Sequence, residues 1–333
     1  MHAPPAPLHP PTEQESDWPP ESPALAEGLV AAWVCVPVVA VFLSLLHELE
    51  HDLVHNLYFS RSRFVQNAML AGVWMMRPNT VNPWFRRRLH VHHHKASGTE
   101  SDWEERAITN GERWGLRRLL MTGDGFLAVA LRPRQTVEVV RAFLRAQRDD
   151  SPERQRRLVR RAKLAYFPLG FAYHGGWYLF IGLTVGRILA GAAGVSVALS
   201  PGQAAALHAL DVVAVALLAP NALRTFALHF VSSNVHYFGD VEPGNVVQQT
   251  QVWTAWWTAP FQLFCFNFGG THAIHHFVVG DPFYVRQAIA KDAHVVLRRN
   301  GVRFNDFGSL GRANRWNARG HRIVGLLRPE PSR

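Results

Sequence analysis

Cysteine is scarce in this chain, with Cys35 and Cys265 as the only two among 333 residues. Both lie in apolar stretches, and neither belongs to a C-x-x-C pair. A disulfide framework and a thiolate metal site are therefore excluded as organising features. We expect both cysteines to be ordinary buried thiols.

Charge is also sparse and unevenly placed. Charged residues make up 18% of the chain, against about 25% in soluble domains. Of the 35 basic residues, 19 fall in residues 86–163 and 11 in residues 286–333, whereas residues 164–285 hold two. Basic blocks that alternate with apolar ones are typical of the cytoplasmic segments of membrane proteins. The excess of basic over acidic residues therefore does not indicate nucleic-acid binding, and we expect no nucleic-acid partner.

No secretory signal peptide is visible, because the first 26 residues hold eight prolines and no basic start followed by an apolar run. We expect residues 1–26 to form a disordered tail that stays in the cytoplasm. Residues 27–285 are predicted to form the folded membrane domain, and residues 286–333 a basic cytoplasmic segment.

Four apolar runs predict the architecture: residues 28–46, 64–76, 164–199 and 204–231. Nineteen helical residues nearly cross a hydrocarbon core of about 30 Å. The runs form two hairpins, so we predict an all-α integral membrane fold with four transmembrane helices and a cytoplasmic helical cap. Both termini then lie in the cytoplasm. The aromatic stretch 250–268 is either a helix at the headgroup level or a buried aromatic cluster.

Histidine, by contrast, is abundant, with 18 residues of which most fall in four groups. The first group is HELEHDLVH, where His47, His51 and His55 are four residues apart and line one face of a helix. Three acidic residues accompany them. The alternative interpretation is a polar helix end at the membrane surface, but it does not account well for three histidines at this spacing.

The second and fourth groups share the spacing H-x-x-H-H, which places three imidazoles on one side of a helix. The pattern occurs in LHVHHH and again 182 residues later in THAIHH. A solvated histidine run does not explain this repeat. The ligand candidates in these groups, with the isolated histidine of the third group, are His90, His93, His94, His236, His272, His275 and His276. His92 lies off the shared face, and we interpret it as a spacer.

Nine or ten imidazoles exceed what one metal binds, since zinc sites use three or four ligands. Two metal ions that share the ligands are the simpler interpretation. Imidazole-rich sites with open positions suit redox iron as well as zinc or copper.

These motifs resemble the three histidine boxes of the membrane fatty acid desaturase superfamily. HDLVH followed by NLYFSRSRFVQN is similar to the first box, Trp84 with LHVHHH to the second, and THAIHH to the third. His236 in NVHYFG is similar to the additional histidine that the family carries before its third box. The resemblance extends over residues 47–285.

The resemblance implies four transmembrane helices capped by a helical domain with a non-haem diiron centre. It also implies O₂ as co-substrate, a lipid or fatty acyl substrate, and electrons from a separate ferredoxin, rubredoxin or cytochrome b5 type protein. The expected location is the bacterial inner membrane. The iron ligands that it implies are His51, His55, His90, His93, His94, His236, His272, His275 and His276, with His47 as a tenth.

The chain departs from the family pattern at its first box, where HELEH and HDLVH overlap. HELEH also resembles the first box of membrane alkane hydroxylases, so His47 and His55 both stand as partners for His51. Ser232 stands where some desaturases place an asparagine. HHKASGTESD is similar to carotenoid ketolases and hydroxylases, and its Glu100 and Asp102 are candidates to orient imidazoles.

The resemblance predicts desaturation of an acyl chain. Hydroxylase, ketolase or oxidative decarboxylase chemistry is the alternative within the superfamily. HELEH also fits the H-E-x-x-H pattern of zinc hydrolases, with Glu48 as base, but a single zinc leaves the H-x-x-H-H pair unexplained. A non-catalytic metal-binding membrane protein is the remaining alternative.

Overall fold

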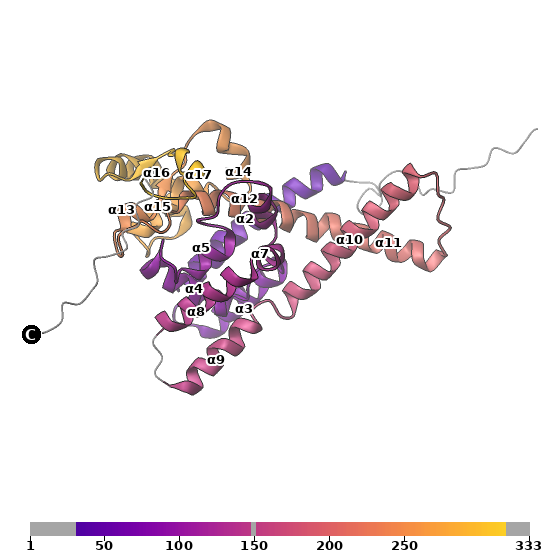
Figure 1. Cartoon of the computed structure of the whole chain (residues 1–333), viewed down its shortest axis with the longest axis horizontal. Coiled ribbons are helices and arrows are strands. Elements are labelled where there is room, and N and C mark those ends of the chain that lie inside the picture. The colour runs from indigo at the N-terminus through magenta and orange to yellow at the C-terminus, as the bar shows by residue number, and fades with distance from the viewer. Residues whose placement is uncertain (1–30, 148–150, 318–333) are drawn as a thin grey trace, which may run out of the picture.

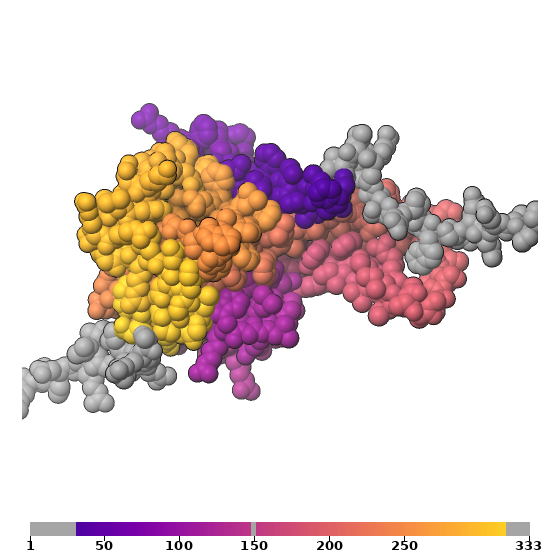
Figure 2. All heavy atoms as spheres, turned by 90° about the horizontal axis from the view of Figure 1, so that it is seen from above, coloured from indigo at the N-terminus to yellow at the C-terminus, as the bar shows by residue number. Residues whose placement is uncertain are grey.

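The computed structural model describes residues 31–147 and 151–317, and most of them are helical. Long helices project on one side of the molecule, and shorter helices with one small sheet gather on the other (Figure 1). The view from above shows the same projection (Figure 2). The predicted helical class is confirmed. The predicted tail, residues 1–26, lies outside the described residues.

Three helices of the described part of the chain are long and apolar enough to cross a membrane. They are α2 (Ala32–Val54), α10 (Leu169–Ala192), and a continuous helix from Pro201 to Val235. Large apolar side chains such as Ile188 and Leu189 of α10 are both 64% exposed, as expected of a lipid-facing surface. We therefore describe the chain as a membrane protein.

The continuous helix consists of α11 (Pro201–Val213), a π-helical turn η1 (Ala214–Leu218) and α12 (Ala219–Val235). Its 35 residues extend about 52 Å, which exceeds the hydrocarbon core of about 30 Å. The end of α12 therefore lies among the shorter helices, where it packs against α2 (Figure 1).

The second predicted span, residues 64–76, forms α3 (Arg63–Met76), a helix of 14 residues and about 21 Å. This length is short for a membrane crossing. Among the described residues there are thus three candidate spans, and the predicted four-span arrangement is not confirmed. The apolar runs at 164–199 and 204–231 do lie largely in long helices, as predicted.

The remaining elements form a helical body around the ends of α2 and α12. Its helices are α4 (Pro83–Ala96), α5 (Trp103–Ile108), α6 (Leu116–Gly123), α7 (Gly125–Leu131), α8 (Pro133–Ala146), α9 (Pro152–Lys163), α13 (Val246–Gln249), η2 (Trp256–Thr258), α14 (Ala259–Leu263), α15 (Phe268–Phe277), α16 (Phe283–Arg299) and α17 (Gly308–Gly311). Two short parallel strands, β1 (Gln251–Val252) and β2 (Arg303–Phe304), complete it.

Helix α4 begins with a side-chain N-cap. The side chain of Asn82 accepts a hydrogen bond from the backbone N–H of Phe85 at 2.9 Å, and Pro83 occupies the first turn. Phe85 and Leu89 then pack with Phe143 of α8 in one apolar cluster. This packing fixes the orientation of α4 and thereby of the histidines that it carries.

Helix α15 approaches α12 closely because Gly269 has no side chain. A Cβ atom at Gly269 would lie 2.4 Å from the side chain of Gln262 and 3.0 Å from Val231 of α12. Phe268 also joins the apolar cluster of Val231 and Trp253. The third histidine box is therefore held against the end of α12.

The C-terminal residues belong to the same body. Helix α16 begins at Phe283, so the predicted boundary at 285 falls inside a helix. Gln251 in β1 accepts a hydrogen bond from the backbone of Asp306 at 2.7 Å. In the aromatic stretch 250–268, Trp253 is buried in an apolar cluster, as one of the two expectations has it, whereas Trp256 is exposed.

The packing of α8 on α4 predicts a stability difference between two positions of α8. Phe143 is fully buried, whereas Val137 is 46% exposed. Phe143→Ala should destabilise the protein by about 3–5 kcal/mol through loss of burial and creation of a cavity, and Val137→Ala by about 0.5 kcal/mol or less. Thermal unfolding of the detergent-solubilised protein measures both, and equal midpoints would contradict this packing.

Candidate metal centre

Nine of the ten histidines predicted as ligands come together in two neighbouring groups inside the helical body. They are supplied by the end of α2, by α4, by the end of α12 and by α15. The first group is His51, His55, His90, His94 and His275. The second group is His93, His236, His272 and His276.

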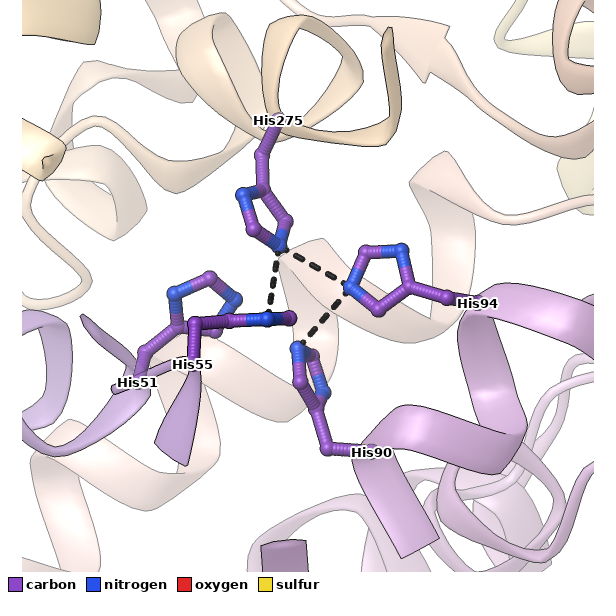
Figure 3. A group of neighbouring side chains, drawn as sticks. All are labelled: His51, His55, His90, His94 and His275. Carbon is purple, nitrogen blue, oxygen red and sulfur yellow. Dashed lines mark hydrogen bonds between the residues drawn. The ribbon is translucent and has the colours of Figure 1, made fainter. Parts of the chain in front are cut away.

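Within the first group, the Nε2 atoms point at one another (Figure 3). The Nε2 atom of His275 lies 3.1 Å from that of His55 and 2.9 Å from that of His94. The Nε2 atoms of His94 and His90 are 3.1 Å apart. The ring of His51 lies beside these residues, with its centroid 4.2 Å from that of His275.

The second group has the same arrangement. The Nε2 atom of His272 lies 3.0 Å from those of both His236 and His276. The Nε2 atom of His93 lies 3.4 Å from that of His276. All four side chains are buried.

The outward nitrogens of four histidines face hydrogen-bond acceptors. The Nδ1 atom of His90 lies 2.9 Å from Glu104, and that of His93 lies 2.9 Å from Asp102. The Nδ1 atom of His276 lies 3.0 Å from the side-chain oxygen of Gln249. These acceptors hold the proton on Nδ1, so the Nε2 lone pair of each ring points inward.

His236 is held in the same way by two oxygen atoms. Its Nδ1 atom lies 2.8 Å from the backbone oxygen of Ser232 and 3.3 Å from the carboxylate of Glu105. The hydroxyl of Ser232 donates to Glu105 at 2.9 Å. Ser232, which departs from the asparagine of some desaturases, thus fixes the carboxylate that faces His236.

His275 is different, because its Nδ1 atom faces a donor. The guanidinium of Arg286 donates to this nitrogen at 2.8 Å, and it also pairs with Glu48 and Asp52, each at 3.2 Å. Arginine has no acceptor. The neutral ring of His275 therefore carries its proton on Nε2, and that proton leaves when Nε2 binds a metal.

Burial keeps most of these rings neutral. It lowers the pKa of His94 to about 3 and that of His55 to about 4, and it lowers the pKa of His276 well below its usual value. His93 differs: burial lowers its pKa, but the carboxylate of Asp102 outweighs burial and raises the pKa to about 9. Neutral imidazole is the form that binds metal ions.

The donor set fits two metal ions. Two nitrogens that bind one ion at about 2.1 Å, at a right angle, lie about 3.0 Å apart. The Nε2 separations of 2.9–3.4 Å match this distance in both groups. Each group therefore has the spacing of a metal site, and most of its rings are neutral, which is the form that binds a metal ion.

Two histidines of the sequence motifs lie outside both groups: His47, which was predicted as a ligand, and His92, which was not. The Nδ1 atom of His47 faces Arg77 at 3.1 Å, and the ring lies against Phe268. His92 faces Ser101 at 3.1 Å, which agrees with its interpretation as a spacer. Of the candidates to orient imidazoles, Asp102 faces His93, whereas Glu100 is exposed.

Sequence reasoning missed the outer partners Glu104, Glu105, Gln249 and Arg286. Each comes from a different element than the histidine it contacts. Gln249, for example, precedes His276 by 27 residues. No local spacing marks such a residue, so the sequence offers no signal for it.

A cavity of about 210 Å³ adjoins the histidines. His51, His90, His93 and His272 form part of its wall. Its other lining residues are about half apolar, and the polar half includes several charged groups. The apolar lining includes Phe85, Leu89, Met121, Ala128, Val139, Ala165, Trp177 and Leu228.

A family comparison agrees with these features. The family model described as fatty acid desaturase matches residues 27–308. No curated protein and no solved structure matches the chain significantly.

The outward hydrogen bond of His93 predicts an effect on metal affinity. In Asp102→Asn, the amide oxygen still caps α5, but the amide N–H can donate to Nδ1 and favour the wrong tautomer of His93. We expect metal affinity to fall by about 10- to 100-fold, measured by titration against a chelator. Glu100→Gln, at an exposed position nearby, should leave it unchanged. Equal affinities in the two variants would contradict this role of Asp102.

Proposed function

Because the chain belongs to the fatty acid desaturase family, we propose that it is an O₂-dependent oxidoreductase that desaturates a fatty acyl or similar lipid chain at a diiron centre. The reaction removes two hydrogens from adjacent carbons. With O₂, two electrons and two further protons, it yields a double bond and two water molecules. The observation that carries this proposal is the pair of buried histidine groups with inward Nε2 atoms.

We propose that each group holds one iron ion. One iron binds to His51, His55, His90, His94 and His275, and the other to His93, His236, His272 and His276. His47 is not included, because it lies outside both groups. When bound, iron with O₂ supplies the oxidising power that unactivated C–H bonds require, which side-chain acids and bases lack.

The protein's own residues prepare this site. The outer carboxylates of Glu104, Asp102 and Glu105 fix the orientation of their histidines. Burial of the rings excludes bulk water from the reacting atoms. The adjoining cavity, whose wall includes many apolar side chains, is where we place the acyl chain.

The zinc hydrolase alternative finds no support in the position of Glu48. Its carboxylate pairs with Arg286 at 3.2 Å, and His47, the first histidine of the H-E-x-x-H pattern, faces Arg77. A general base for hydrolysis needs its carboxylate next to a metal-bound water. The two acidic residues next to His51 are both committed to ion pairs, because Glu50 pairs with Arg77 and Asp52 with Arg286.

We propose that a separate ferredoxin, rubredoxin or cytochrome b5 type protein delivers the electrons. The chain has two cysteines, and an iron–sulfur centre of the ferredoxin or rubredoxin kind needs four. We propose that the basic residues concentrated in 86–163 and 286–333 attract an acidic carrier. We place both termini on the cytoplasmic side of a bacterial inner membrane.

The ligand assignment predicts metal content and activity. Purified protein should hold two iron ions per chain. His93→Ala and His276→Ala should each lower iron content and abolish O₂-dependent activity without loss of membrane insertion. His92→Ala is the matched control on the same helix as His93, and it should keep both irons. Full turnover in His93→Ala would contradict the assignment.

The choice of desaturation predicts the product. Lipids and hydrocarbons from cells that express the chain, compared with cells that express His276→Ala, should contain a species two hydrogens lighter than its precursor, with no added oxygen. Mass spectrometry of the extracted lipids makes this comparison. A product that gains oxygen would instead indicate hydroxylation, and one shortened by a carbon would indicate oxidative decarboxylation.

A further inference from the structure

Arg224 in the cavity wall makes no ion pair, and the described residues give its guanidinium little hydrogen-bond compensation. Arg224 lies on α12, and its side chain is 1% exposed. Its guanidinium makes one hydrogen bond, from Nη2 to the hydroxyl of Thr225 at 2.6 Å. Its Nε and Nη1 atoms have no hydrogen-bond partner among the described residues.

The acidic groups nearby are already committed to other arginines. Glu50 pairs with Arg77 and, at 3.0 Å, with Arg86. Arg86 also pairs with Glu104 at 3.5 Å. No ion pair among the described residues includes Arg224.

An unpaired buried arginine is costly. Removal of a charge from water costs several kcal/mol when no opposite charge compensates it. Arginine does not release its proton under ordinary conditions. The guanidinium of Arg224 therefore requires an anion, and the cavity is where that anion has room.

The remainder of the cavity indicates what the anion is attached to. The same wall contains the apolar side chains of Leu89, Ala128, Trp177 and Leu228. It also reaches four histidines of the two groups. A ligand that satisfies the whole cavity therefore has one negative group and an apolar chain, and part of that ligand lies beside the histidines.

We infer that Arg224 binds the carboxylate of a free fatty acid, so that the substrate is an unesterified acid. This inference rests on the proposed function, since it names the substrate of that site. A single carboxylate supplies the one negative charge that Arg224 lacks. The carbonyl group of a thioester or an ester carries no charge, and neither does a hydrocarbon, so none of these places a negative charge at that end of the acyl chain. The amide nitrogen of Asn79 donates to the hydroxyl of Thr225 at 2.7 Å, and its amide oxygen has no partner among the described residues. That oxygen is an acceptor, so it does not compete with Arg224 for the carboxylate.

The experiment is equilibrium binding to the full chain in lipid nanodiscs, with empty nanodiscs as background. The probes are hexadecanoate, methyl hexadecanoate and hexadecanol, which share a chain and differ in the head group. The ionised acid should bind at least tenfold more tightly than either neutral analogue. Arg224→Gln should weaken binding of the acid by about 10- to 100-fold and leave the neutral analogues unchanged.

Arg187→Gln is the matched control, because Arg187 lies on a membrane-spanning helix but already pairs with Asp211 at 3.1 Å. It should not change the affinity for the acid. Arg224→Met tests folding separately: loss of an unpaired buried charge should leave the ligand-free protein at least as stable. Arg224→Lys, which keeps the charge, should retain part of the affinity.

Two results would overturn the inference. One is equal binding of the acid and its methyl ester, and the other is unchanged acid binding in Arg224→Gln. Because binding is measured without turnover, these results are independent of whether the chain oxidises its ligand. Selective acid binding without any oxidation would instead count against the proposed function alone.

Discussion

Nine histidine rings, seven of them buried and two half-buried, meet in two groups with Nε2 separations of 2.9–3.4 Å, which suits rings that share a metal ion. This constraint accounts for much of the surrounding structure. The carboxylates and the amide oxygen outside the rings fix the tautomers of the rings they face, and burial keeps most of the rings neutral. The helices that supply the rings must therefore meet at one place with little freedom. Gly269, which has no side chain, permits α15 to pack closely on α12.

The long helices have two roles along their length. Their outer parts are apolar and exposed, as for Ile188 of α10, whereas the ends of α2 and α12 enter the helical body. His55 and His236 lie just past those two ends. The metal centre is thus joined directly to the membrane-spanning part, and a lipid chain that leaves the bilayer has a short path to it. This geometry suits a substrate that is insoluble in water.

Most buried charges around the two histidine groups are paired. The acidic residues of HELEHD are used as partners for Arg77, Arg86 and Arg286, so they stabilise the helical body and do not join the histidine groups. Arg106 and Arg118 make no ion pair, but both donate to backbone oxygens. Arg224 stands apart, because it lines the cavity with one hydroxyl as its partner among the described residues. A buried charge with so little compensation in a cavity wall marks the place of a ligand.

The sequence by itself determined the helical class, the long apolar segments and the identity of nine histidines, because helical spacing and hydrophobic length are local properties. Tertiary structure decided how those histidines divide. His90 and His94 join one group and His93 the other, and His275 likewise separates from His272 and His276. His90 stays with His94 and His272 with His276, each pair four residues apart, but which helix faces meet depends on packing between distant segments. The same reason explains why His47 falls outside the groups and why the unpaired state of Arg224 emerges only in the folded chain.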